Sequence, residues 1–131
     1  MSEPSGCECL SGPTLIFACS GAADVGEISD LAARKLTKDG VGKMFCLAGV
    51  GGRVGGIMDK TKAARRVLAI DGCQLDCARL TLELADIQDF SHLRITDLGM
   101  EKGKTSATLD AVAQVASQAE SLLGRQVAGG K

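Results

Sequence analysis

The chain has 131 residues, 45% of them apolar, and a formal net charge of −1, so it is long enough to fold as one domain around a hydrophobic core. It has three Phe but no Trp or Tyr, and its basic residues are scattered. This argues against a nucleic-acid partner, because such proteins cluster basic residues and stack bases on aromatic rings. No stretch approaches the roughly 18–20 apolar residues of a membrane span, and residues 1–12 lack the pattern of a signal peptide. We therefore expect a cytoplasmic protein with no membrane partner.

Short apolar runs alternate with helical patterns along the chain. The first run, TLIFAC at 14–19, has no polar alternation and is typical of a strand buried on both faces. Apolar residues then recur at helical spacing over 22–38, up to the helix-ending pair Asp39-Gly40. The same alternation predicts the remaining elements: strand 42–47, a glycine-rich segment at 49–56, helix 57–64, strand 66–71, helix 73–85, strand 92–97 and helix 106–123.

This order of elements predicts an α/β fold. Strands that alternate with helices run parallel and are joined by right-handed crossovers, with helices on both faces of the sheet. We expect a three-layer α/β/α sandwich with a mostly parallel sheet of about four strands, flavodoxin-like or Rossmann-like, in strand order 2-1-3-4 or 3-2-1-4. The domain is assigned to 13–123, after a mobile N-terminal arm (1–12) and before a C-terminal tail (124–131).

Four of the six cysteines fall where the predicted strands end. Cys19 closes strand 14–19, Cys46 lies near the end of strand 42–47, and Cys73 follows strand 66–71 by two residues. The carboxyl ends of parallel strands meet at one edge, where ligands bind. Neighbouring strands lie about 4.8 Å apart, and Zn–S bonds of about 2.3 Å place the sulfurs of one zinc under about 4 Å apart, which side chains from neighbouring strands can reach. Cys77, four residues after Cys73, is predicted to share a helix face with it.

The sequence therefore predicts one zinc ion per chain, bound by Cys19, Cys46, Cys73 and Cys77. An iron–sulfur cluster uses the same four-cysteine donor set and stays open as an alternative. So does the simpler interpretation in which the cysteines are small apolar residues that fill the core.

The segments around these cysteines resemble the DGC-domain family, which is associated with zinc binding. The resemblance rests on ACSG at 18–21, CLAGVGG at 46–52, the triplet Asp71-Gly72-Cys73 with CA at 77–78, and TDLG at 96–99. It implies a bacterial or archaeal cytoplasmic protein that holds zinc through the four cysteines named above. It implies no particular activity, and it does not include Cys7 and Cys9.

Several other patterns suggest enzymatic or binding roles. Cys73 or Cys77 would be the reactive thiolate of a redox or sulfur-transfer enzyme, with the pair Cys7 and Cys9 resolving it and a small molecule or protein thiol as partner. Cys73 and Arg79 also fit the C-x₅-R spacing of enzymes that bind an oxyanion, although the segment between them has no glycine.

The glycine-rich segment Gly49–Gly56 would bind a nucleotide phosphate through its backbone, with Asp71 as the ribose-binding acid, but it departs from G-x-G-x-x-G at Val54. Thr96 and Asp97 are candidates for orienting metal ligands. The single histidine, His92, is predicted to lie on the surface at the end of the sheet away from the cysteines.

Overall fold

The computed structural model describes residues 12–124. Its centre is a four-stranded, all-parallel sheet in the order β2-β1-β3-β4. The α/β fold predicted from the sequence is confirmed, and of the two strand orders left open the structure has 2-1-3-4. The strands are β1 (Thr14–Ala18), β2 (Lys43–Met44), β3 (Arg66–Asp71) and β4 (Ser91–Arg94).

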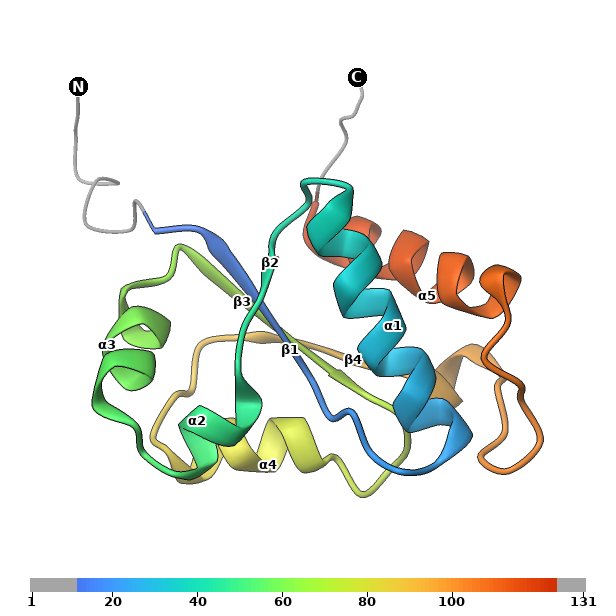
Figure 1. Cartoon of the computed structure of the whole chain (residues 1–131), viewed down its shortest axis with the longest axis horizontal. Helices are drawn as coiled ribbons and strands as arrows, with labels where there is room; N and C mark the ends of the chain where they lie inside the picture. The colour runs from blue at the N-terminus through green and yellow to red at the C-terminus, as the bar shows by residue number, and fades with distance from the viewer. Residues whose placement is uncertain (1–11, 125–131) are drawn as a thin grey trace.

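Helices cover both faces of the sheet (Figure 1). On one face lie α1 (Asp24–Lys38) and α5 (Leu109–Leu122), and on the other lie α2 (Leu47–Gly51), α3 (Gly55–Ala63) and α4 (Cys77–Leu84). Successive side chains of a strand point to opposite faces. Accordingly, Ile16 of β1 packs in the core under α1 and α5, whereas Phe17 packs in the core under α2 and α4. Two buried faces explain why the strands are continuous apolar runs.

Several element boundaries differ from those predicted. β2 has only two residues, and Cys46 is the N-cap of α2 rather than a strand residue. The glycine-rich segment 49–56, predicted as a loop, contains the end of α2 and the start of α3. The fourth strand ends at Arg94, and a 3-10 helix, η2 (Ile95–Leu98), replaces its predicted second half.

The helix predicted at 73–85 begins only at Cys77, so Cys73 does not share a helical turn with it. The reason is Asp76, which has a left-handed backbone conformation (φ 53°) that interrupts a right-handed helix. Within residues 12–124, no helix is long and apolar enough to cross a bilayer.

Candidate functional site

Three cysteines line one cavity at the carboxyl edge of the sheet. Cys19 directly follows β1, Cys73 lies two residues after β3, and Cys77 is the first residue of α4. They border a space of about 400 Å³ together with Lys102, and we call it the cysteine cavity. Cys19 and Cys73 are partly buried and Cys77 is exposed; all three are free thiols. The predicted convergence at this edge therefore holds for these three residues.

Cys46 lies in a neighbouring cavity of about 430 Å³, which it shares with Cys19. Its side chain is exposed, and its sulfur accepts a hydrogen bond from the Gly49 N–H at 3.3 Å as the cap of α2. Cys19 thus lies between the two cavities. No three of the four sulfurs lie within 4.8 Å of one another among the described residues, so the four-cysteine set stays a prediction. The pair Cys7 and Cys9 lies outside the described residues.

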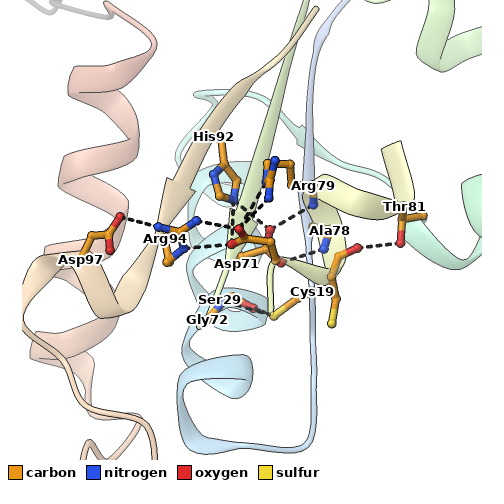
Figure 2. Close-up of polar contacts among 12 residues, drawn as sticks. Cys19, Ser29, Asp71, Gly72, Ala78, Arg79, Thr81, His92, Arg94 and Asp97 are labelled. Carbon is orange, nitrogen blue, oxygen red and sulfur yellow. Dashed lines mark hydrogen bonds and ion pairs between the residues drawn. The ribbon is translucent and has the colours of Figure 1, made fainter. Parts of the chain in front are cut away.

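Polar groups from two other elements hold the Cys19 sulfur (Figure 2). The Gly72 N–H donates to it at 3.4 Å, and the Ser29 hydroxyl lies 3.2 Å away. Ser29 is fully buried in α1, where it donates to the Gly26 carbonyl and accepts from the Ser20 N–H. Ser29 was not among the residues predicted from the sequence. The sequence did contain an indication of its role, because Ser29 falls among the apolar residues of α1, and a buried hydroxyl needs a hydrogen-bond partner.

Negative charge is concentrated around Cys77. Burial raises the pKa of the Cys77 thiol, and the charges of Asp71, Cys19 and Cys73 raise it further. The Lys102 ammonium opposes this effect and donates a hydrogen bond to the Cys73 sulfur at 3.6 Å. A cation bound beside Cys77 would stabilise its thiolate.

The loop that carries Lys102 is fixed by Asp24, the first residue of α1. The Asp24 carboxylate accepts hydrogen bonds from the N–H groups of Gly103 and Thr105, both at 2.9 Å. These two bonds lower the pKa of Asp24, and the bond from Gly103 has the larger effect. The contact spans 79 residues of sequence, and no local pattern indicated it.

A second cluster of polar side chains lies next to the cysteine cavity. Its members are Asp71, Asp76, Arg79, His92 and Arg94, and we call it the buried charge network (Figure 2). Asp71 and Asp76 are only 1% and 3% exposed. Asp76 accepts two hydrogen bonds from Arg94, at 2.9 and 2.6 Å, and two from Arg79, at 3.2 and 3.0 Å.

Asp71 binds to the start of α4. Its carboxylate accepts from the N–H groups of Ala78, at 2.7 Å, and Arg79, at 3.0 Å, and it lies 2.9 Å from His92 Nε2. These N–H groups would otherwise be unpaired in the first turn of the helix. Asp71 thus acts as the cap that Asp76, the formal N-cap residue, does not provide.

The buried charge network does not fit a metal ion. Asp71, Asp76 and His92 form the one set of three ligand atoms within 4.8 Å of one another among the residues that the structure describes. However, the four carboxylate oxygens already accept bonds from two guanidinium groups, two backbone N–H groups and the histidine. A cation would have to displace these donors and lie beside two arginines. We interpret the network as structural.

The structure corrects several predictions made for these residues. His92 is not a surface residue at the far end: it lies in β4 with its side chain 20% exposed and contacts Asp71 and Asp76. Arg79 binds Asp76 and Glu83. Its guanidinium is therefore not free to bind an oxyanion beside Cys73, as the C-x₅-R spacing had suggested.

The nucleotide-binding hypothesis and the ligand-orienting role of Asp97 both lose support. For the nucleotide, the bonds of Asp71 to α4 leave this carboxylate unavailable for a ribose. Gly49 is needed for close packing, because a Cβ at this position would collide with Ile57. Asp97 binds Arg94 at 3.1 Å and faces solvent, 62% exposed.

Comparison with known proteins identifies the family. The model of the DGC domain matches residues 15–119. The chain belongs to the DGC-domain family. It is also similar to the Anaerobic and virulence modulator AnvM of Pseudomonas aeruginosa, at 33% identity over 88 residues, which is 67% of each chain. No solved structure matches the chain significantly. Membership of this family supports a cysteine-rich, metal-binding class of protein.

Proposed function

We propose that the protein binds one zinc ion through Cys19, Cys46, Cys73 and Cys77 and uses the site in thiol or metal handling. The observation that carries this proposal is the cysteine cavity, in which three cysteines line one space and burial, together with the charges of Cys19 and Cys73, raises the pKa of the Cys77 thiol. A divalent cation removes that repulsion, and four thiolates are a preferred donor set for zinc.

Binding requires a local closure of the site. The sulfurs must come within about 4 Å of one another for Zn–S bonds of about 2.3 Å. Cys46 is exposed and shares a cavity with Cys19, so its side chain would turn toward the cysteine cavity without disturbing either core. Cys77 must lose its proton on binding, and zinc affinity should therefore fall as the pH falls.

A role in handling fits the surroundings of the site better than a purely structural role. Both cores consist of aliphatic residues and Phe17 from the sheet and its covering helices, with the cysteines only at their margins. We therefore expect the metal-free protein to stay folded, unlike small domains that need zinc to fold. Exposed Cys46 and Cys77 would let a small molecule or a protein thiol exchange with the ligands. Free thiols persist in a reducing cytoplasm, where we place this function.

Metal analysis tests the proposal. Protein purified without chelator should contain close to one zinc per chain, and single Cys→Ser changes at positions 19, 46, 73 and 77 should each lower that content. The double variant Cys7→Ser/Cys9→Ser is the matched control and should keep its zinc. Full zinc content in Cys19→Ser would contradict the proposal. Iron, labile sulfide and visible absorption would instead indicate an iron–sulfur cluster in the same donor set.

A second candidate is a thiol-based redox or sulfur-transfer enzyme that uses Cys73. The Lys102 ammonium lies beside the Cys73 sulfur, whereas the raised pKa of Cys77 disfavours its thiolate. This favours Cys73 over Cys77 as the nucleophile. The test is iodoacetamide labelling of metal-free protein: one rapidly alkylated Cys73 in a protein that takes up no zinc would support the enzyme.

A further inference from the structure

The two buried carboxylates stand at the two ends of the segment that carries Cys73. Asp71 is the last residue of β3, and Asp76 immediately precedes Cys77. The buried charge network therefore holds both ends of the loop 72–75, and Cys77 extends directly from its second end. A further bond, from the Thr96 N–H to the Gly72 carbonyl at 3.2 Å, joins the same loop to η2.

Arg94 of β4 links this loop to the sheet, together with His92 of the same strand, which contacts Asp71 and Asp76. The Arg94 guanidinium binds both oxygens of Asp76, at 2.9 and 2.6 Å. Arg79 binds the same carboxylate but belongs to α4 itself, and so it moves with the helix. Arg94, by contrast, lies on a strand paired with β3. It therefore fixes the loop relative to the sheet from which Cys19 projects.

We propose that Arg94, acting through Asp76, is a positioning residue that sets Cys73 and Cys77 against Cys19 in the cysteine cavity. Asp76 has a left-handed backbone, which is an uncommon conformation outside glycine and needs surrounding contacts to persist. The two-pronged bond to Arg94 supplies such contacts in a fixed plane. This inference deepens the proposed zinc site and rests on it.

The experiment compares Arg94→Gln and Arg94→Lys with Lys35→Gln. Arg79 still binds Asp76 in both Arg94 variants, which keeps one cation beside the buried carboxylate and preserves the fold. Lysine keeps the charge of Arg94 but cannot make the paired bonds. Lys35 forms an exposed pair with Asp39, at 3.0 Å, near the far end of α1, and therefore serves as the matched control.

The first measurement needs no metal. Metal-free protein is labelled with iodoacetamide under native conditions, and the rates at Cys73 and Cys77 are divided by the rate at Cys46, which caps another helix and serves as the internal reference. We expect both ratios to change in the two Arg94 variants and to stay at the wild-type value in Lys35→Gln. Unchanged ratios in folded Arg94→Gln and Arg94→Lys would overturn the inference.

The second measurement uses the metal alone. Zinc affinity should fall about 10- to 100-fold in both Arg94 variants, and the absorption spectrum of bound Co²⁺ should change shape, as expected for altered ligand geometry. Loss of stability alone would leave that spectrum unchanged in the folded fraction.

The two failures are separable. Wild-type protein that takes up no zinc but shows the labelling change would refute the proposed function and keep the positioning role. Wild-type protein that binds zinc, together with unchanged labelling ratios in the Arg94 variants, would keep the proposed function and refute the positioning role. Wild-type labelling ratios in Arg94→Lys with changed ratios in Arg94→Gln would overturn the requirement for paired bonds.

Discussion

The cysteine cavity and the buried charge network lie side by side at the carboxyl edge of the sheet, yet they differ in how far their polar groups are satisfied. In the network, every carboxylate oxygen accepts from at least one donor, and the two aspartates are almost fully buried. In the cavity, the sulfurs of Cys19 and Cys73 have only a few contacts, of 3.2 to 3.6 Å, and Cys77 is exposed. A group with satisfied partners fixes structure, whereas under-coordinated soft donors near one another favour binding a cation. We therefore expect the first region to stabilise the second.

The largest effect is expected from Asp76→Ala. This change leaves Arg94 and Arg79 without their shared carboxylate. Both arginines are partly exposed and still pair with Asp97 and Glu83, respectively, so we expect a loss of about 2–4 kcal/mol, less than the full cost of a buried unpaired charge. Urea denaturation of reduced, metal-free protein measures the free energy of unfolding. Asp39→Ala, which removes an exposed pair with Lys35, is the control and should cost less than about 1 kcal/mol. Equal losses in the two variants would show that the network contributes no more than a surface ion pair.

Gly72→Ala tests the residue that joins the two regions. A Cβ at Gly72 would lie 2.8 to 2.9 Å from backbone and side-chain atoms of Val25 in α1, so the loop or the helix must move. We expect a loss of about 1–3 kcal/mol in unfolding free energy, together with weaker zinc binding, because the Gly72 N–H also contacts the Cys19 sulfur. Gly21→Ala is the control, since a Cβ there meets nothing within 4 Å. If Gly72→Ala were as stable as the wild type, the packing of Gly72 against Val25 would have room for a Cβ, contrary to this prediction.

Lys102→Glu probes the charge of the cysteine cavity. Four thiolates on one zinc carry net negative charge, so a glutamate in place of the ammonium beside Cys73 should weaken zinc binding. The group is exposed, and the change should be at most about fivefold and smaller in high salt. Lys104→Glu makes the same charge change two residues away, at a side chain that pairs with Glu101. Equal effects of the two substitutions would indicate a general charge effect and no specific contact.

The smallest effect is local and depends on pH. The folded-state pKa of Asp24 is below 3.8, because the N–H groups of Gly103 and Thr105 donate hydrogen bonds to its charged form. The bond from Gly103 has the larger effect. The stabilisation is therefore fully present above 3.8 and is lost as the pH falls through the folded-state pKa. The amide chemical shifts of Gly103 and Thr105 in NMR spectra should titrate with a midpoint below 3.8. In Asp24→Asn this titration should vanish; its persistence would assign it to another group.

Local patterns predicted most of the framework. The apolar runs at β1 and β3 have no polar alternation, and the structure buries them on both faces. Strand β3 has the predicted bounds, and α1 begins only two residues later than expected. The order 2-1-3-4 was not predictable, because both orders considered keep the first three strands contiguous. The predicted start of α4 was wrong because it depends on the backbone conformation of a single residue. Asp76 has a left-handed backbone, and the helix begins only after it.

The candidate site was predictable only as far as strand ends and sequence spacing define it. Cys19 and Cys73 reach one cavity because they follow strands that end at the same sheet edge, and Cys77 reaches it as the first residue of the helix after β3. Cys46 was assigned to a strand, but the chain turns into α2 after two strand residues and carries it to the neighbouring cavity. His92 was misplaced because its strand begins one residue before it and runs beside β3, toward Asp71.

The sequence by itself determined the parallel sheet, the two buried faces and the delivery of cysteines to its carboxyl edge, because these follow from apolar periodicity and strand order along the chain. Only the tertiary structure decided which polar groups meet across long stretches of sequence. Asp24 with Gly103, Gly72 with Cys19, and Asp76 with Arg94 are separated by 79, 53 and 18 residues. Such contacts depend on the packing of whole elements, and no local propensity encodes them.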